Sequence, residues 1–212
     1  MSSKKKSIPP YWTSGIKYLL NVDPILSEII KKHKNVSYLR CTSTIFQTFL
    51  SIILGQQISV EAANSIEKRI KIHVKTITPK NILATKDDDL RSMGLSFRKI
   101  QYIKGVANIT LKNRNFFSKL LDMNDVDAIA TLCKLYGIGT WSAEMFLIFQ
   151  HNRQNILPLG DIGLINSFCN NYNIAKKDFL KTISYYRKVW DPYCTVATWY
   201  LWRSIDDEPI QY

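Results

Sequence analysis

The chain has 212 residues, of which 46% are hydrophobic, and its 29 Lys and Arg against 17 Asp and Glu give a formal net charge of +12. This hydrophobic content excludes a disordered basic tail, and the length suffices for one compact domain or two small lobes. The charge indicates a polyanionic partner, with nucleic acid as the first candidate. A biased genomic composition rich in Lys, Asn and Ile is the alternative explanation.

Other classes of protein are excluded by what the sequence lacks. No run of about eighteen apolar residues appears, so no membrane span is predicted. Residues 1–10 carry charge but no apolar core, unlike a secretory signal. The cysteines are far apart and form no C-x-x-C pair, which argues against a zinc site or disulfide framework and indicates a reducing compartment. They are Cys41, Cys133, Cys169 and Cys194.

Hydrophobic periodicity predicts helices along the whole chain. In chain order, helical segments are expected at 23–32, 44–54, from Val60 onward, from Phe97 onward behind Ser96 as a cap, and at 125–135, 140–149, 162–170, 176–188 and 192–204. Breaks are expected where proline restricts the chain, at Pro24, Pro79, Pro158 and Pro192. No stretch alternates β-branched and polar residues for long, so any sheet is confined to a short N-terminal piece. The predicted fold class is all-α.

Residues 132–143, LCKLYGIGTWSA, predict two helices joined by a tight hairpin at Gly137-Ile138-Gly139. The two glycines permit positive φ and leave no side chain in the way, so backbone N–H groups can bind a phosphate. The helix that begins near Thr140 adds the positive end of its dipole, which attracts an anion without reading any base. Gly-x-Gly alone is shared by many ordinary turns, so the surrounding sequence decides.

That surrounding sequence resembles the helix-hairpin-helix superfamily of DNA glycosylases, in particular the DNA-3-methyladenine glycosylase II family. The family's hairpin and the aspartate that follows it stand here as residues 132–143 and Asp161. Three further segments also resemble the family: 54–59 (LGQQIS), 94–99 (GLSFRK) and 199–203 (WYLWR). The resemblance spans roughly residues 45–212, and four motifs in the right order are far more specific than one. Tyr136 departs from the family, which usually has proline there.

The resemblance implies two helical lobes flanking a cleft that holds an extruded nucleotide, with the hairpin on the DNA backbone beside it. We expect residues 1–43 to pack with the C-terminal lobe, residues 44–134 to form a central lobe, and residues 135–212 to carry the hairpin and the aspartate. No Gly/Ser linker or internal repeat divides the chain.

The activity that the resemblance implies is that of a monofunctional DNA glycosylase in base excision repair. Such an enzyme flips an alkylated purine out of the duplex, hydrolyses its N-glycosidic bond and leaves an abasic site. Alkylation makes the purine a good leaving group, so the enzyme must mainly stabilise positive charge on the sugar. One carboxylate does this directly or by orienting a water, and Asp161 is the candidate catalytic residue. Asp161 is also placed to cap the helix that begins at Ile162, and the two roles are compatible.

Three side chains are expected around the flipped base. Bifunctional relatives carry a lysine two residues after the second hairpin glycine, where its amine attacks C1′. This chain has Trp141 there, which predicts hydrolysis by water. Trp202 is expected to stack on the cationic purine, and Met145 stands where a close relative has an aromatic residue. Core packing is the alternative for Trp141 and Trp202.

The expected DNA contacts lie around the hairpin and after residue 55. Gln56 and Gln57 stand at the expected DNA edge, and Gln57 corresponds to the residue that relatives insert into the gap left by the flipped nucleotide. An exposed turn is the alternative, and Ser59 caps the next helix in either case. The remaining expected contacts are Arg98, Lys134, Gly137, Ile138, Gly139 and Thr140, although exposed basic residues are usually just solvated.

The resemblance also implies ligands and partners. Backbone carbonyls of Cys133, Leu135 and Ile138 are expected to bind Na⁺ or K⁺; no cofactor is required, and the cysteine spacing of an iron–sulfur cluster is missing. The expected partner is double-stranded DNA with an alkylated base, with no membrane association and a monomeric state. The expected compartment is the cytoplasm of a bacterium or the nucleus of a eukaryote.

Two other functions stay open. A non-catalytic protein that binds DNA structures needs the hairpin but neither Asp161 nor the tryptophans. A glycosylase for oxidised or mismatched bases is expected to carry a lysine in place of Trp141, or an iron–sulfur cluster. The sequence also leaves the preferred lesion open among 3-methyladenine, 7-methylguanine, ethenoadenine and hypoxanthine.

Overall fold

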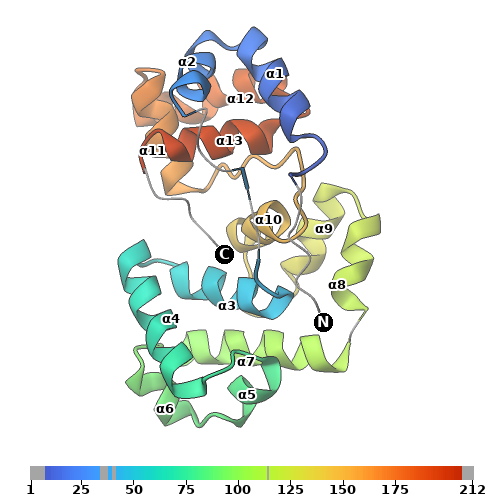
Figure 1. The fold of residues 1–212 in the computed structure, drawn as a ribbon, viewed down its shortest axis with the longest axis vertical. Coiled ribbons are helices and arrows are strands. Elements are labelled where there is room, and N and C mark those ends of the chain that lie inside the picture. The colour runs from blue at the N-terminus through green and yellow to red at the C-terminus, as the bar shows by residue number, and fades with distance from the viewer. Residues whose placement is uncertain (1–7, 34–37, 40–41, 114, 207–212) are drawn as a thin grey trace. The chain divides into compact units, whose positions relative to one another are not determined.

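A computed structural model of the chain describes residues 8–33, 38–39, 42–113 and 115–206. These residues form thirteen α-helices and two 3-10 helices, with no strand among them (Figure 1). The predicted all-α class is therefore confirmed. None of the described helices is long and apolar enough to span a bilayer. The basic segment 1–7 and Cys41, which were used above to argue against a secretory signal and a zinc site, lie outside the described residues.

The helices form two compact units. One comprises the described residues up to Thr42 together with those from Leu147 onward, and is called the terminal unit here; the other, Ser43–Phe146, is the central unit. The expected boundary after Lys134 differs from this division, because the hairpin and most of the following helix belong to the central unit. The reason is packing: Phe146 stacks on Phe49 with ring centroids 4.3 Å apart and planes 16° apart.

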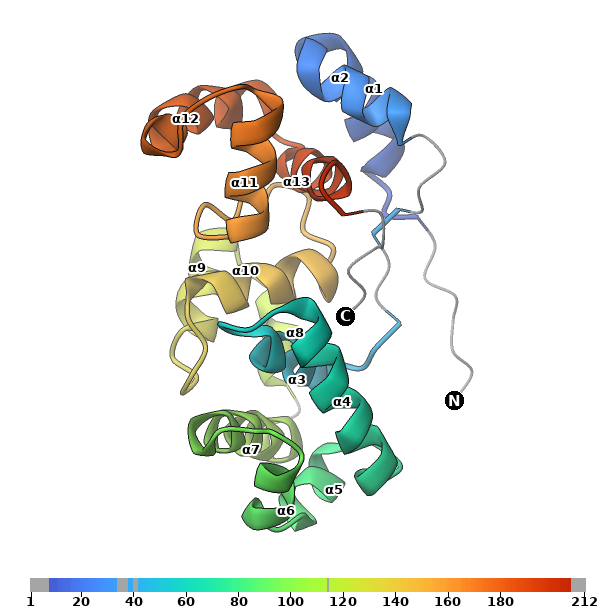
Figure 2. The ribbon, with the colours of Figure 1, turned by 90° about the vertical axis from the view of Figure 1, so that its left-hand side faces the viewer.

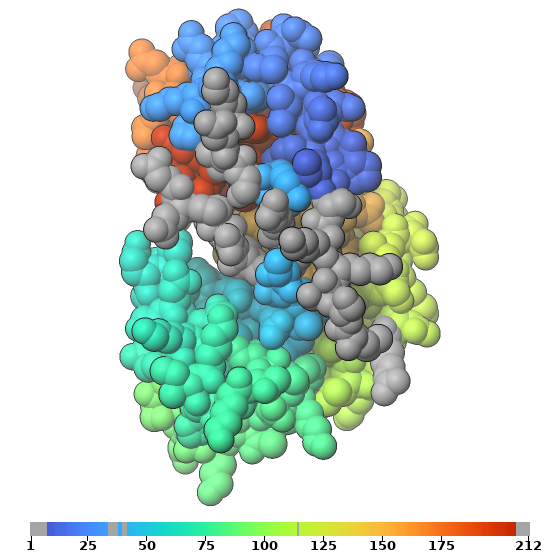
Figure 3. Space-filling view, viewed as in Figure 1, coloured from blue at the N-terminus to red at the C-terminus, as the bar shows by residue number. Residues whose placement is uncertain are grey.

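The central unit is built on two helices that pack against each other, α3 (Ile45–Gly55) and α7 (Phe97–Lys112). The other elements are α4 (Val60–Val74), α5 (Pro79–Ala84), α6 (Asp87–Ser92), α8 (Phe116–Lys119), η1 (Leu120–Asp122), α9 (Asp125–Leu132) and the first part of α10 (Thr140–Phe149). Phe117 completes an aromatic core with Phe49 and Phe146. α4 to α6 form much of the face of this unit drawn in Figure 3, and α4 turns Ile66 and Ile70 inward.

The terminal unit surrounds α13 (Cys194–Arg203), all ten residues of which are buried. Figure 2 shows α13 between α1 (Trp12–Val22) and α2 (Pro24–Lys32) on one side and α11 (Ile162–Asn171) and α12 (Phe179–Trp190) on the other. The short η2 (Lys176–Asp178) precedes α12.

A buried aspartate ties the N-terminal helices to the rest of the terminal unit. Asp23 is 1% exposed and caps α2 by accepting the Leu26 N–H at 3.0 Å. Its other oxygen accepts the Trp190 indole N–H at 2.8 Å and the Tyr172 hydroxyl. Buried carboxylates need such donors, and the same burial and charge raise the pKa of Tyr172. Residues up to 33 therefore fold onto the C-terminal third, as expected.

Local signals place most of the helix starts. Ser96 and Ser59 cap α7 and α4 as predicted, each accepting the N–H three residues on. Pro24 and Pro79, where breaks were expected, are the first residues of α2 and α5, because proline lacks the N–H that a first helical residue does not need. The predicted helix 125–135 ends earlier, at Leu132, and the predicted helix 176–188 is divided into η2 and α12.

Candidate active site

Asp161 is the N-cap residue of α11, as the sequence predicted. Its Oδ2 accepts the Leu164 backbone N–H at 2.7 Å. The same oxygen accepts the indole N–H of Trp202 at 2.8 Å. The preceding loop is closed by a hydrogen bond from the Asp161 N–H to the Pro158 carbonyl at 2.9 Å. The carboxylate is thus held from its own helix and from α13, and the residue is only partly buried.

Trp202 has a second contact that fixes its ring. The side chain is 3% exposed, and it lies parallel to Phe149 with ring centroids 5.9 Å apart and planes 4° apart. The sequence predicted a stacking surface for the base and missed the hydrogen bond to Asp161. No local signal reveals that bond, because the two residues are 41 positions apart.

Gly163 is a functional candidate that sequence reasoning missed. It is the second residue of α11 and lies against the bond between Asp161 and Trp202. A Cβ at this position would stand 3.1 Å from Asp161 Oδ2 and 3.3 Å from Trp202 Cδ1. A side chain there would crowd the carboxylate, so glycine leaves room for the hydrogen bond.

The hairpin follows the prediction at one glycine and departs from it at the other. Gly137 has φ +83°, and a Cβ there would lie 2.1 Å from Cγ of Tyr102. Both the backbone conformation and the lack of space therefore require glycine at this position. Gly139 does not adopt positive φ, contrary to the expectation for both glycines. Its carbonyl accepts the Ala143 N–H at 3.0 Å, which makes Gly139 the residue that caps α10. An N-cap residue typically adopts extended backbone, whereas a left-handed glycine is typical just after the C-terminal end of a helix.

The predicted DNA contacts at the hairpin are of two kinds, exposed residues and one residue with a buried side chain. Lys134, Gly139 and Thr140 are exposed, as is Arg98 at the start of α7. Ile138 is 4% exposed, so its side chain is part of the core and only its backbone is placed to meet a phosphate. A glycine cap brings no side-chain oxygen of its own to the first N–H groups of α10, and the N-terminus of a helix suits an anion.

Gln56 and Gln57 are adjacent but differ in environment. The Gln56 side-chain amide donates to the Gly137 carbonyl at 3.0 Å and to Ser142 Oγ at 2.9 Å. This residue therefore braces the hairpin, a role that the sequence prediction of a DNA contact did not include. Gln57 is exposed and has φ +59°. Ser59 caps α4 by accepting the Ala62 N–H at 3.2 Å.

The predicted base-pocket residues lie in different units. Trp141 is half-buried, and Met145, four residues on along α10, is 2% exposed. Both belong to the central unit, whereas Trp202 belongs to the terminal unit. Their joint lining of one base pocket stays a prediction.

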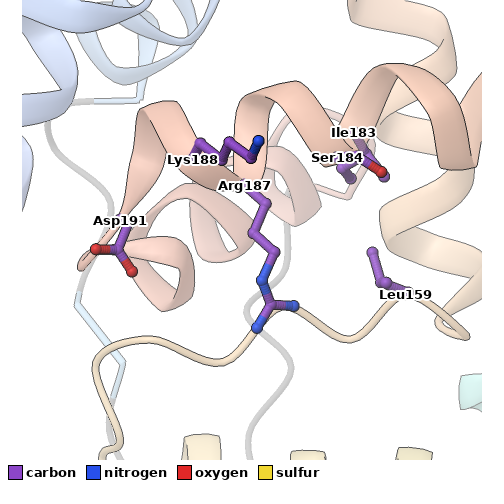
Figure 4. A pocket seen from close by; sticks show the side chains of 6 residues that line it. All are labelled: Leu159, Ile183, Ser184, Arg187, Lys188 and Asp191. Carbon is purple, nitrogen blue, oxygen red and sulfur yellow. The ribbon is translucent and has the colours of Figure 1, made fainter.

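A cavity of about 490 Å³ opens on the terminal unit. It is lined by Leu159, Ile183, Ser184, Arg187, Lys188 and Asp191. Figure 4 shows the Arg187 side chain reaching from α12 towards the loop that carries Leu159. Because neither Asp161 nor Trp202 lines this cavity, it is not part of the candidate active site.

Side-chain metal ligands do not cluster in the described residues, where no group of three or more His, Cys, Asp or Glu is placed to hold an ion. Described cysteines are free thiols, and burial raises the pKa of Cys194 to about 12. At the hairpin, the Leu135 carbonyl accepts the Ile138 N–H at 3.0 Å. A carbonyl oxygen keeps a second lone pair after such a bond, so this geometry is compatible with the predicted cation.

An all-α fold with a glycine hairpin between α9 and α10 defines a helix-hairpin-helix protein. A sequence profile for the HhH-GPD superfamily of base excision DNA repair proteins matches residues 50–192, and the chain belongs to this superfamily. The family resemblance in the sequence is thereby confirmed at the level of the superfamily.

Individual relatives agree with this assignment. A DNA-3-methyladenine glycosylase of Saccharomyces cerevisiae is 30% identical over 207 residues, which are 90% of this chain and 70% of the relative. The solved structure of a DNA-3-methyladenine glycosidase from Bacillus halodurans is 32% identical, with a TM-score of 0.73, over 90% of this chain and 88% of that one. A Schizosaccharomyces pombe 3-methyladenine DNA glycosylase in complex with abasic DNA shares the fold, with a TM-score of 0.75 at 24% identity, over 93% of this chain and 100% of that one.

Proposed function

We propose that this protein is a monofunctional DNA glycosylase that hydrolyses the N-glycosidic bond of alkylated purines, of the 3-methyladenine type, in double-stranded DNA. The observation that carries the proposal is the Asp161 carboxylate, held at the start of α11 by the Leu164 and Trp202 N–H groups. The relatives named above, which are 3-methyladenine glycosylases, support the choice of substrate.

The chemistry requires a fixed negative charge beside the sugar. As the bond between C1′ and the purine nitrogen breaks, its electron pair neutralises the cationic base, and positive charge develops on C1′ and the ring oxygen. A preorganised carboxylate stabilises that charge without having to reorient during the reaction. Water then adds to C1′ and gives up a proton, for which Asp161 is the acceptor in this proposal. Two hydrogen bonds on Oδ2 keep the carboxylate in one orientation throughout.

The product of this reaction is an intact abasic strand. A lyase needs an amine at C1′ to form a Schiff base, and the position that would supply it carries the indole of Trp141. The proposal therefore includes base removal by water alone, with strand breakage only on later treatment with alkali.

In this proposal the hairpin binds the phosphate backbone of the DNA. Exposed Gly139 and Thr140 at the start of α10 present N–H groups that suit a phosphate. A monovalent cation held by the carbonyls of Cys133, Leu135 and Ile138 would add positive charge there, and replacing Na⁺ and K⁺ by tetramethylammonium would weaken DNA binding. The proposal includes no iron–sulfur cluster or other cofactor, a monomeric protein, and action in a bacterial cytoplasm or a eukaryotic nucleus.

Release of methylated purines from alkylated duplex DNA under single-turnover conditions tests the proposal. Asp161→Asn keeps a capping oxygen at α11 but removes the charge, so we expect base release to fall by about 10²-fold or more with little change in thermal stability. Asp23→Asn is the matched control, since Asp23 also caps a helix and accepts an indole N–H. It should lower stability without lowering the release rate of the folded protein.

Three results would contradict this assignment. DNA binding without release of any damaged base would favour the non-catalytic alternative. Strand cleavage before alkali would contradict the interpretation of Trp141. Release of oxidised or mismatched bases, with alkylated purines untouched, would move the protein to the other class of glycosylase.

A further inference from the structure

One face of α7 supports both segments of the central unit that are assigned to DNA. Lys99 and Tyr102 are three residues apart on this helix, and residues at that spacing lie on the same side of a helix. Lys99 contacts the turn between α3 and α4, which contains Gln57. Tyr102 packs on the hairpin at Gly137 and meets the Tyr136 ring edge-on, with centroids 4.9 Å apart.

The Lys99 ammonium closes the end of α3. Its Nζ donates to the Leu54 carbonyl at 2.6 Å and to the Gln56 carbonyl at 2.9 Å. The last carbonyls of a helix lack partners within the helix, and a cation there also complements the helix dipole. Both partners of the ammonium are backbone carbonyls, and burial lowers the pKa of Lys99.

The turn that Lys99 holds is one that needs support. Gln57 has φ +59°, a left-handed conformation that a residue other than glycine adopts only where its surroundings require it. Both carbonyls bound by Lys99 come from the three residues before Gln57. The ammonium therefore fixes the backbone immediately before the exposed Gln57 side chain.

Gln56 connects this turn to the hairpin. Its backbone carbonyl accepts from Lys99, and its side-chain amide donates to the Gly137 carbonyl and to Ser142 Oγ. Ser142 is 2% exposed in the first turn of α10. The Gln57 turn and the hairpin are thus joined to each other by Gln56, and both are joined to α7.

We propose that Lys99 is a positioning residue for base extrusion, which holds the Gln56–Gln57 turn so that Gln57 meets the DNA at a fixed distance from the hairpin. The inference rests on the proposed function, because insertion of a side chain matters only to a protein that flips a nucleotide. In this arrangement the phosphate grip and the inserted residue form one rigid body, and the binding energy of the hairpin is used to drive Gln57 into the duplex.

A double-mutant cycle with two readouts tests this inference. Lys99→Met, Gln57→Ala and the double variant are compared for single-turnover release of methylated purines. They are also compared for 2-aminopurine fluorescence opposite a tetrahydrofuran abasic site in a bound duplex, which reports insertion. We expect each single variant to lose about tenfold or more in release rate. The double variant should be no slower than the slower single variant, because Lys99 acts through Gln57.

Lys104→Met is the matched control. Lys104 also lies on α7, and its Nζ also donates to a backbone carbonyl, that of Thr85 at 2.9 Å. Release and fluorescence should stay at the wild-type level in this variant. If Lys99→Met fails to fold, Gln56→Leu cuts the connection at its other end and should also lose the insertion signal.

The outcomes separate this inference from the proposed function. If the effects of Lys99→Met and Gln57→Ala multiply, or if Lys99→Met behaves like Lys104→Met, Lys99 does not act through Gln57. If the wild type releases no damaged base, the proposed function fails. Amide hydrogen exchange at residues 56–58 then decides the positioning role alone, and equal exchange in the wild type and Lys99→Met would overturn it.

Discussion

Two aspartates of the terminal unit begin helices in the same way, and the comparison separates structure from chemistry. Asp23 and Asp161 each cap a helix and accept an indole N–H at 2.8 Å, from Trp190 and Trp202 respectively. Asp23 is 1% exposed, whereas Asp161 is only partly buried. Asp23 uses both carboxylate oxygens for these bonds and accepts the Tyr172 hydroxyl as well, whereas Asp161 receives both donors on Oδ2.

Trp202→Phe tests what the indole contributes, since it keeps an aromatic face and loses the N–H. We expect single-turnover base release to fall by about tenfold or more, because the Asp161 carboxylate is then less firmly held. Trp190→Phe should instead lower the free energy of unfolding by about 1–3 kcal/mol, the effect of a lost hydrogen bond to a carboxylate, and leave release by the folded protein unchanged. A wild-type rate in Trp202→Phe would show that Trp202 contributes its ring face, as the sequence prediction had it.

Gly163→Ala tests the space around the same carboxylate. The new Cβ would stand 3.1 Å from Asp161 Oδ2, so we expect slower base release through displacement of the carboxylate. Stability should be unchanged or raised, since alanine favours a helix over glycine by about 0.5–1 kcal/mol. Gly105→Ala, within α7 and with no atom within 4 Å of the new Cβ, is the control and should stabilise without slowing release. Equal rates in both variants would mean that Asp161 tolerates the displacement.

At the level of elements, the two hairpin glycines are expected to fail in different ways. Gly137→Ala puts a Cβ 2.1 Å from the Tyr102 ring at φ +83°, and we expect it to cost about 1–3 kcal/mol or more of stability. Gly139→Ala meets no atom within 4 Å, so the protein should fold normally but bind duplex DNA more weakly, because the methyl group blocks a phosphate. Thermal unfolding and fluorescence anisotropy measure the two effects. Normal DNA binding by Gly139→Ala would place the phosphate elsewhere.

The sequence predicted an element well where its signal is local. α10 spans Thr140–Phe149 as expected, and α11 runs one residue beyond its predicted end. α1 was missed because its N-cap residue, Tyr11, makes no side-chain capping bond. α5 and α6 have six residues each, too few for the apolar period to show. α9 ends at Leu132, three residues before the predicted end at Leu135.

The same contrast holds for the candidate site. Asp161 and Ser59 were recognised as caps because their partners are three residues away. Gln56 was assigned to the DNA edge, while its side chain binds the Gly137 carbonyl 81 positions away. Gly139 was expected at positive φ together with Gly137, although an N-cap residue typically has extended backbone. Interactions between distant segments decide these residues, and periodicity does not report them.

For the molecule as a whole, the net charge of +12 predicts DNA binding that weakens steeply with salt. Each phosphate neutralised by a basic residue releases counterions and contributes about 0.9 to the slope of log affinity against log salt concentration. Lys134 is exposed beside the hairpin, and Arg98 is exposed at the start of α7. If these side chains contact phosphates, Lys134→Ala and Arg98→Ala should each reduce the slope by about one.

Lys71→Ala is the control for net charge alone. Lys71 is exposed on α4 and paired with Glu67 at 2.6 Å, so its loss lowers the net charge by the same amount without removing an expected phosphate contact. The slope should then stay at the wild-type value, as measured by anisotropy titrations of an abasic-site duplex at several salt concentrations. Equal reductions in all three variants would mean that the charge acts as a general field over the surface. Reductions confined to Lys134 and Arg98 would place the DNA backbone at the hairpin, the position from which the Lys99 and Gln56 contacts are proposed to direct Gln57.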